Sequence, residues 1–523
     1  FEPRERAYLD LLCDQLCDWG TVSAWSSQDL VTRVERLDRG RATPFGVPEL
    51  SSPGVTQRTI TLPTGVGVPI TDTVQSLIET RSFRRLSLIN QLSMLSIVYP
   101  GAGYKRNVHC LFSYELARQL ALHLYATPTF RLYFDDADVK RLLLAALLHD
   151  INHFPFLHIM QELGPELSQV RILDALCDGT LTSEGGDPGT PSIYEVLSQV
   201  EIDPSRFRRY VFPRAGEALS EPDQAIVSML HSGVDLDKLS YLYLDAYFTG
   251  VRYGSGIDYG NILQAASVEA LGNSRLHLAF ADRAVQALEN VVMTRFWNFR
   301  SVYWHHTNRA VMAMVMHVAR TLYEDEEGGI VSYVHDTIWL DDLEAMRYLD
   351  RKYLDVYGKI SPLHELEIDR RRLYKRLYTT HPERELGSDD ALLDGMKHLS
   401  GEKRRQFREH VASGLSDLLS GSGSAVEVDS DDVLYDVPGR KLDSGGRVYV
   451  RGGDGQVVPL ASLSAPVREV DKNYEALAKR ARIFVSPEIA RYFPGNRRLE
   501  LREQIARILH TALRAVEPES DVA

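Results

Sequence analysis

Hydrophobic residues recur at intervals of three and four positions along most of the middle of this chain, which is the spacing of amphipathic helices. From Thr73 to about Leu322 the pattern is mostly helical, and the clearest helices are predicted over 74–80, 110–126, 136–150 and 236–248. The same spacing predicts outer helices over 5–19, 341–358, 364–379 and 499–516. We therefore expect a mainly α protein built around a helical core.

Short apolar runs next to turn residues predict β-structure in two places. Two such runs within 56–70 flank Pro63-Thr64-Gly65, a combination typical of a β-hairpin. A run over 480–485 predicts one strand near the C-terminus. The expected fold thus adds a small N-terminal β-hairpin and a C-terminal α+β region to the helical core.

The segment from Ser416 to Gly455 differs from its surroundings in composition. It contains Ser420-Gly421-Ser422-Gly423-Ser424 and further glycine pairs between short valine-rich runs, which is typical of a flexible linker with short hairpins. We accordingly divide the chain into an N-terminal helical extension (1–54), a core (55–330), a helical C-terminal lobe (331–415), this linker (416–455) and a C-terminal α+β segment (456–523).

Composition narrows the class of protein. Of 523 residues, 44% are hydrophobic and 25% charged, which argues against a disordered or fibrous chain. With 59 basic and 72 acidic residues the net charge is −13, so the sequence gives no indication of single-stranded nucleic-acid binding. Only four cysteines are present, and the longest clean apolar run, Leu142–Leu148, is too short to span a bilayer. We expect a cytoplasmic protein without a membrane partner.

The candidate chemistry lies in a cluster of histidines. Five of the sixteen histidines fall within residues 109–158, and His149 is followed directly by Asp150 at the end of an apolar helix. Imidazole nitrogens and carboxylate oxygens are ligands for divalent cations. The alternative is a set of core or capping histidines, and we favour that interpretation for His123. For the later pair His335-Asp336 we expect solvent-exposed residues next to a helix, because no other ligand residues lie nearby in the sequence.

Three segments in order resemble the H…HD…D signature of the HD phosphohydrolase superfamily. Within that superfamily they are similar to the dNTP triphosphohydrolase branch, which includes bacterial dGTPases and the animal SAM-and-HD-domain dNTPase. The segments are Tyr99–His109 (with Pro-Gly-Ala at 100–102), His149–His158 and Val234–Asp245. The resemblance runs from about Arg58 to Thr380 and weakly over Asp471–Val485. It implies an HD-domain helical core and hydrolysis of deoxynucleoside triphosphates to deoxynucleoside and triphosphate.

The resemblance also implies a metal site and a catalytic set. The metal ligands would be His109, His149, Asp150 and Asp237, and their mixed nitrogen and oxygen donors suit iron, manganese, zinc or magnesium. His158 would be the general acid for the leaving group, and His153 would steer phosphate or solvent. Asp237 belongs to both sets.

Substrate contacts follow from the same resemblance. Asp237, Tyr241 and Asp245 are four residues apart and therefore share one helix face. Gln91, beside Leu92, and Asp245 would bind the sugar 3′-hydroxyl, and Tyr303 would pack on the deoxyribose. The phosphate contacts would come from Arg106, Lys238, Tyr241 and Arg295.

The chain departs from the family pattern at several points. Gln161 stands where relatives carry an acid, and no further histidine appears around Pro165–Val170. The hairpin run Thr61–Gly65 lacks the family's Asp, so activation by an allosteric nucleotide is left open, and we expect no SAM domain. We expect a homo-oligomer of unknown number. Two alternatives remain: an HD phosphohydrolase acting on another nucleotide or a nucleic-acid end, and a non-enzymatic nucleotide-sensing protein with a retained metal site.

Overall fold

The computed structural model describes residues 46–51, 58–160, 169–181, 189–213, 217–271, 275–324, 329–366, 372–380, 387–437 and 448–516. Helices dominate these residues, which confirms the predicted mainly α class. The predicted helix over 5–19 and the departure at Gln161 lie outside the described residues.

The elements of the first part of the chain surround one long helix, α6. They are β1 (Arg58–Thr61), β2 (Gly67–Ile70), α4 (Asp72–Glu79), α5 (Arg81–Arg84), α6 (Arg106–Tyr125), α7 (Pro128–Tyr133), α8 (Asp136–Leu148), α9 (Leu157–Met160), α10 (Gln169–Cys177), α11 (Ile193–Gln199), α12 (Pro204–Val211), α13 (Glu221–His231), α14 (Leu236–Thr249) and α15 (Tyr259–Gln264).

Two strands and five helical segments follow. They are β3 (Ala266–Leu271), β4 (Arg275–Ala281), α16 (Val285–Asn298), the π-helical segment η7 (Phe299–Tyr303), α17 (His306–Tyr323), α18 (Gly329–Thr337) and α19 (Asp342–Tyr357). The C-terminal elements are β5 (Lys375–Thr379), α20 (Gly387–His398), α21 (Gly401–Ser420), β6 (Val433–Asp436), β7 (Tyr449–Arg451), β8 (Val457–Pro459), α22 (Leu460–Leu463), α23 (Ala465–Ala478), β9 (Arg482–Val485), α24 (Pro487–Ala490), α25 (Gly495–Glu500) and α26 (Arg502–Val516).

The core forms where α8 and α14 pack against α6. Helix α8 starts at a capping box between Asp135 and Asp138, and its residues Leu142–Leu148 are completely buried. A helix that is apolar on all sides is stable only inside a protein. Its C-terminal end, which carries His149, is thereby fixed in the middle of the molecule.

The predicted hairpin is confirmed, because β1 and β2 pair antiparallel from Arg58–Ile70 to Thr61–Gly67. A four-stranded sheet of order β3-β4-β7-β8 was not predicted. Its signal was present in the sequence, since Leu276, Leu278 and Phe280 of β4 recur at every second position and are buried. The alternation is short and was overlooked between strongly helical neighbours.

The C-terminal region contains one wrong prediction. The helix expected over 364–379 is not formed, because residues 375–379 form strand β5 instead. Strand β9, confirmed near its predicted position, is buried at all four residues and lies between β5 and β6. A buried central strand must pair on both edges, and this tertiary demand outweighs the local helical pattern of 375–379.

The predicted linker 416–455 is also more regular than its composition indicates. Residues up to Ser420 complete α21, and β6 pairs with β9 and buries Val433 and Leu434. The valine-rich runs supply the apolar side chains for this packing. Strands β7 and β8 form a short hairpin, whereas 438–447 lie outside the described residues. The five-segment division of the chain remains a prediction.

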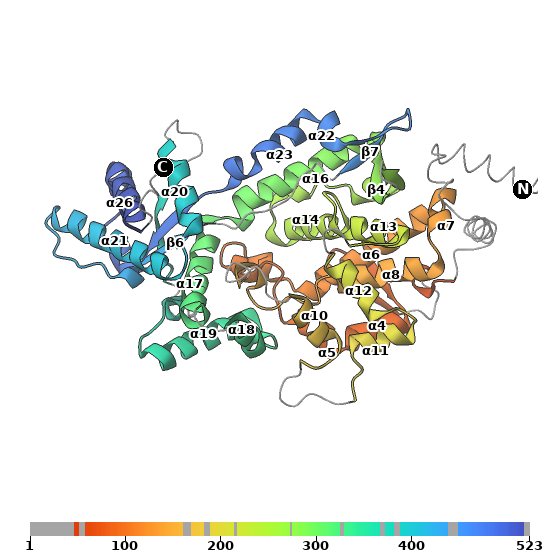
Figure 1. The fold of residues 1–523 in the computed structure, drawn as a ribbon, viewed down its shortest axis with the longest axis horizontal. Helices are drawn as coiled ribbons and strands as arrows, with labels where there is room; N and C mark the ends of the chain where they lie inside the picture. The colour runs from red at the N-terminus through yellow and green to blue at the C-terminus, as the bar shows by residue number, and fades with distance from the viewer. Residues whose placement is uncertain are drawn as a thin grey trace, which may run out of the picture.

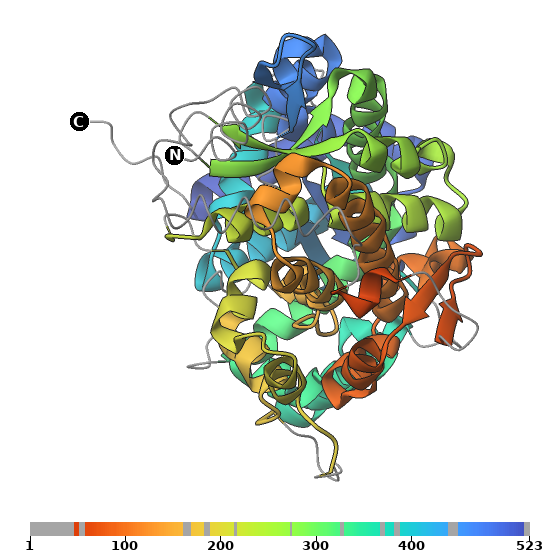
Figure 2. The same ribbon diagram turned by 90° about the vertical axis from the view of Figure 1, so that its right-hand side faces the viewer.

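Figure 1 shows the C-terminal helices α20, α21 and α26 at one end of the molecule and α7, α8 and α13 towards the other. Helix α17 lies between them, and α16 and α23 run side by side along one edge. The perpendicular view in Figure 2 places the β3-β4 hairpin beside the α6 bundle. In the part of the chain described, no helix combines the length and the apolar character needed to cross a membrane.

Candidate metal centre and phosphate-binding pocket

Helix α14 positions one line of polar side chains against the core. It begins at Asp235, whose carboxylate accepts the Lys238 backbone N–H at 2.7 Å, and it ends at Gly250 in the left-handed conformation. Both residues suit these cap positions, since Asp is a favoured N-cap and glycine adopts positive φ at no steric cost. The helix register between these caps places Asp237, Tyr241 and Asp245 on a single face.

Three side chains from α6, α8 and α14 converge at the predicted metal position. His109 Nε2 lies 3.1 Å from His149 Nε2 and 3.2 Å from Asp237 Oδ1. His149 Nε2 is 3.5 Å from the same carboxylate oxygen. All of their ligand atoms fall within 4.8 Å of one another, so His109, His149 and Asp237 could hold a metal ion.

The outer nitrogens of both histidines are fixed by hydrogen bonds. His149 Nδ1 is 2.8 Å from the Ala146 carbonyl oxygen, which can only accept, so Nδ1 carries the proton. Ser240 Oγ donates to the His109 carbonyl at 3.3 Å, and His109 Nδ1 therefore donates to Ser240 Oγ at 2.8 Å. When the two rings are neutral, each Nε2 therefore directs its lone pair to the centre, the tautomer that a metal requires.

Asp150, the fourth predicted ligand, has two competing partners. Its oxygens lie 3.7 Å from both His109 Nε2 and His149 Nε2. Arg106 donates to Oδ2 at 2.8 Å, and His153 Nδ1 is 3.2 Å from Oδ1. Burial opposes ionisation of Asp150, but His153, His149 and Arg106 hold its pKa well below the ordinary range. A charged carboxylate is thus available beside the three convergent ligands.

The charges of the site fit a cation. Burial acts to lower the pKa of His149, yet the neighbouring Asp150 and Asp237 raise it to about 9. Burial likewise opposes ionisation of Asp237, and the two histidines nevertheless keep its pKa well below its usual value. The site therefore attracts positive charge, and two imidazoles with one or two carboxylates are a donor set that first-row metals accept.

The loop after α8 carries the two predicted catalytic histidines. Buried Arg85 donates to the carbonyl oxygens of Ile151 and His153 and fixes this loop. Phe156 has φ +60, an uncommon conformation for a bulky residue that turns the chain into α9. His153 is buried, and burial together with Arg106 puts its pKa well below the usual value. His158 is exposed, with its ring centroid 5.4 Å from that of His153.

The predicted phosphate-binding residues surround the next two turns of α14. Lys238 Nζ donates to the buried carboxylate of Asp235 at 2.7 Å. Burial raises the pKa of Asp235 to about 7, against the effect of Lys238. Arg295 of α16 donates from Nε to the Tyr241 hydroxyl at 3.2 Å. Arg295 and Tyr241 thus contact each other one turn along α14 from Asp237, whereas Lys238 pairs with Asp235 at the start of the helix.

The predicted sugar-binding residues form a separate cluster at the far end of α14. Asp245 accepts hydrogen bonds from the Tyr104 and Tyr303 hydroxyls, each at 2.5 Å, and burial raises its pKa to about 7. Leu92 and Tyr303 pack against the same small apolar cluster. Gln91 Oε1 is buried and, among the described residues, has no hydrogen-bond partner. An unsatisfied buried oxygen here is consistent with a ligand group.

Sequence reasoning missed two residues of the site. Ser240 lies 131 positions from His109, and Tyr104 lies 141 positions from Asp245. The position of Ser240 gave a signal, since it stands three residues after Asp237 in a helix. Tyr104 gave none, because its neighbour Gly101 sets its location: a Cβ at 101 would overlap the Phe248 carbonyl, so only glycine lets this turn approach α14.

Comparisons with known families agree with this geometry. Residues 106–176 match the HD domain, and residues 265–510 match the HD associated region. The first match begins at Arg106 and includes His109, His149 and Asp150. The chain is therefore an HD-domain protein that carries an HD associated region.

Similar proteins include both bacterial and animal chains. "Uncharacterized protein YwfO" of Bacillus subtilis is 28% identical over 258 residues, which are 48% of this chain and 53% of that protein. "Deoxynucleoside triphosphate triphosphohydrolase SAMHD1" of Gallus gallus is 26% identical over 344 residues, 59% of this chain and 54% of that protein. The human SAMHD1 is 25% identical over 333 residues, 58% of this chain and 52% of that protein. The chain thus spans about half the length of the curated relatives it matches.

A solved structure supports the fold. The crystal structure of a "hypothetical protein" from Aquifex aeolicus superposes with a TM-score of 0.60 at 21% sequence identity. It covers 85% of this chain and 100% of its own. This likeness concerns the arrangement of helices and strands alone.

Proposed function

We propose that this protein is a metal-dependent dNTP triphosphohydrolase of the dGTPase-like type, which splits deoxynucleoside triphosphates into deoxynucleoside and triphosphate. The observation that carries the proposal is the order of groups along α14. Asp237 belongs to the candidate metal ligands, Lys238 and, from α16, Arg295 are cationic groups beside the helix, and Asp245 is buried at its far end, an order that corresponds to the phosphate and sugar parts of such a substrate. The SAMHD1 relatives, named for this activity, support it.

In the proposed reaction, separate groups of residues bind the metal, the phosphates and the sugar. His109, His149, Asp237 and Asp150 would hold the metal, which when bound polarises a phosphoryl oxygen and lowers the pKa of a coordinated water. Arg106, Lys238, Tyr241 and Arg295 would bind phosphate oxygens, for which the planar arginine fork is suited. Gln91, Leu92, Asp245 and Tyr303 would orient the sugar. His153, neutral near pH 7, would steer phosphate or solvent.

The leaving deoxynucleoside oxygen needs a proton, and we assign its delivery to His158. This histidine is exposed next to the buried His153, so it can exchange protons with solvent. His158→Ala should lower kcat on the order of 10²-fold, a typical value for a general acid, and leave metal content unchanged. Steady-state kinetics with elemental analysis check this. Unchanged turnover would assign the proton to another group.

The reaction itself is tested with a substrate panel. The purified protein is incubated with each dNTP and NTP in Mn²⁺, Mg²⁺ or Fe²⁺, and products are separated by anion-exchange chromatography, because phosphate-detecting dyes miss triphosphate. We expect deoxynucleoside and triphosphate in equal amounts. Release of phosphate or pyrophosphate would contradict the proposal.

One observation favours the alternative of another nucleotide substrate. Both carboxylate oxygens of Asp245 already accept a tyrosine hydroxyl, so a 3′-hydroxyl would have to share them. Cleavage of a panel nucleotide at a different phosphate bond, giving nucleoside monophosphate and pyrophosphate, would support this alternative. Binding of nucleotides with no product at all would support a sensing protein.

We also propose that the protein acts as a cytoplasmic homo-oligomer on free nucleotides. The oligomer is expected from the family resemblance, and light scattering with and without dNTP measures its number and any nucleotide dependence.

A further inference from the structure

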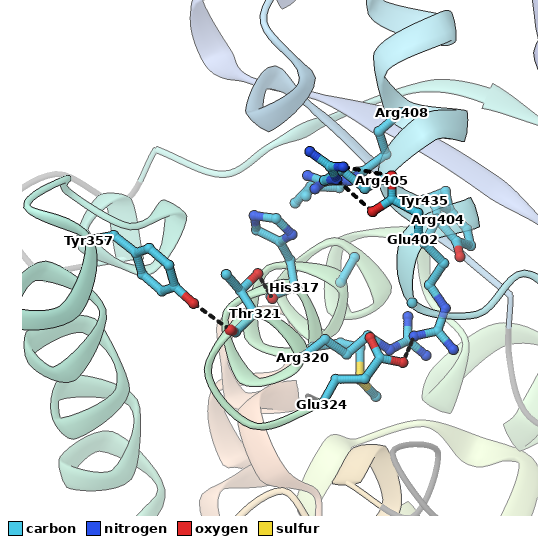
Figure 3. Close-up of a pocket in the computed structure, with 14 residues that line it drawn as sticks. His317, Arg320, Thr321, Glu324, Tyr357, Glu402, Arg404, Arg405, Arg408 and Tyr435 are labelled. Carbon is cyan, nitrogen blue, oxygen red and sulfur yellow. Dashed lines mark hydrogen bonds and ion pairs between the residues drawn. The ribbon is translucent and has the colours of Figure 1, made fainter. Parts of the chain in front are cut away.

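A pocket lies away from the metal centre, between α17 and α21. Its volume is about 240 Å³, and strand β6 forms its floor. Four arginines line it: Arg320 from α17, and Arg404, Arg405 and Arg408 from α21. Figure 3 shows these side chains on two sides of His317, with Tyr357 on a third side.

Helix register explains why the arginines converge. Arg404 and Arg408 are one turn apart on α21, and His317 and Arg320 are nearly one turn apart on α17. Both helices pack against β6, and both pairs of side chains line the same pocket (Figure 3). Tyr357 closes one side by donating to the Thr321 carbonyl at 2.7 Å.

The three arginines of α21 differ in how many of their N–H groups already donate hydrogen bonds to neighbouring residues. Glu402 binds Arg405 through both oxygens, at 2.6 and 3.0 Å, and this guanidinium is largely exposed. Arg404 uses Nη1 for Glu324 and Nε for the Leu399 carbonyl. Arg408 uses Nη1 for the Ser430 carbonyl at 3.2 Å and Asp431 at 3.4 Å. Arg404 and Arg408 are better buried than Arg405, and within the described part of the chain neither Nη2 has a hydrogen-bond partner.

The pocket carries net positive charge inside an acidic protein. Its lining contains four arginines and two glutamates, Glu324 and Glu402, so 4 − 2 gives +2, whereas the whole chain carries −13. Asp431 lies outside this lining, 3.4 Å from Arg408 and 4.0 Å from Lys359, so it is shared between a pocket arginine and a surface lysine. Arginine charges held close together destabilise one another in a partly buried site, and a bound anion relieves this repulsion.

A buried imidazole at the centre gives an independent sign of a ligand. The His317 side chain is 9% exposed. Its Nε2 atom is buried without a hydrogen bond to any described residue, and the nearest carboxylate oxygen, of Asp431, is 3.6 Å away. Asp431 forms an ion pair with this nitrogen, but 3.6 Å is longer than a hydrogen bond, so Nε2 can take a closer partner such as a ligand oxygen.

We propose that this pocket binds a phosphate dianion, either as inorganic phosphate or as the phosphomonoester of a small metabolite. A dianion neutralises the charge of +2, and a phosphate presents enough oxygens to engage the forks of Arg404 and Arg408 together with His317. The volume lies below the range of pockets for drug-sized ligands, which favours a small molecule. The pocket shares no residue with the metal centre.

Calorimetric titration of the full chain with inorganic phosphate, and separately with glycerol phosphate, tests the proposal. We compare the wild type with Arg404→Ala and Arg408→Ala. Each variant should bind at least about tenfold more weakly, because each loses a charge-assisted hydrogen bond. Preference for glycerol phosphate identifies a phosphomonoester, and equal or stronger binding of phosphate identifies the free ion.

Three further variants distinguish binding in this pocket from binding elsewhere on the protein. Arg351→Ala removes an exposed arginine of α19 outside the lining and should bind like the wild type. Arg405→Ala should weaken binding less than Arg408→Ala, since Glu402 already occupies that guanidinium. Glu324→Gln frees Arg404 and raises the lining charge to +3, so it should bind more tightly, a gain that misfolding does not produce.

The proposal is overturned if phosphate and glycerol phosphate bind the Arg404→Ala/Arg408→Ala double variant as tightly as the wild type, because that binding would belong to the metal centre. It is also overturned if Glu324→Gln leaves the affinity unchanged while the arginine variants retain their wild-type melting temperature.

Discussion

The two ends of helix α14 carry the same residue type in opposite electrostatic states. Both Asp237 and Asp245 are subject to burial, which opposes ionisation. At the first end two histidines reverse the effect, and the pKa of Asp237 falls well below its usual value. At the second end the partners are neutral tyrosines, and the pKa of Asp245 rises to about 7. Two turns of helix thus separate a carboxylate suited to a cation from one suited to a hydroxyl.

The largest expected effect comes from removing the carboxylate at the metal end. Asp237→Ala should lose most bound metal and reduce hydrolysis on the order of 10³-fold, since a catalytic metal supplies several kcal/mol. Asp245→Ala should retain the metal. Elemental analysis of both proteins decides the comparison, with Asp355→Ala, an exposed aspartate of α19, as control. Full metal content in Asp237→Ala would refute the ligand assignment.

The metal end also depends on a residue that does not touch the metal. Ser240→Ala removes the acceptor for His109 Nδ1 and should weaken metal affinity by about 10- to 100-fold, the usual effect of losing an outer hydrogen bond. Competition with a fluorescent chelator measures this affinity. Ser255→Ala, which alters an exposed serine of the same chain, should leave it unchanged. Equal affinities would mean that the His109 tautomer is set in another way.

A smaller effect is expected at the sugar end. Tyr303→Ala should narrow the ratio of dNTP to NTP turnover by about tenfold, because the ring that would exclude a 2′-hydroxyl is lost. Tyr303→Phe keeps the ring and removes only the hydrogen bond to Asp245, so it should retain most of the preference. Competition between dATP and ATP provides the measurement. Equal rates for the two in the wild type would already contradict this role.

The smallest effect is a pH dependence of stability. The folded-state pKa of Asp245 is about 7 and the unfolded value is near 3.9, so the folded chain holds this proton more tightly. The resulting stabilisation is present in acid and is lost as the pH rises through about 7. Between pH 5 and pH 8 the melting temperature of Asp245→Asn should fall a few degrees less than that of the wild type. If the melting temperatures of the wild type and of Asp245→Asn change equally between pH 5 and pH 8, Asp245 does not titrate in this range.

The contrast between the Asp237 end and the Asp245 end of α14 also shows which parts of the site could be predicted from the sequence. The metal end was predictable because its residues lie in short, ordered segments, and His109, His149 and Asp237 do meet. The tyrosine end depends on Tyr104, which reaches Asp245 only through the packing of a turn against α14. Similarly, β5 became a strand because β9 required a partner. Residues that a family motif names together could be predicted to meet even across three helices, whereas contacts set by packing that no motif records could not.

The π-helical segment η7 has a consequence for how related chains should be aligned. A π-helical turn holds one residue more than the α-helical turn it replaces, and each residue in an α-helix advances about 100° around the axis. Deleting a single residue between Arg295 and Tyr303 would therefore swing the tyrosine about a quarter-turn away from Asp245 while every side chain in the segment kept its identity. The length of this segment thus fixes where Tyr303 lies relative to Asp245, and in the proposed function it would help to determine which sugar is accepted.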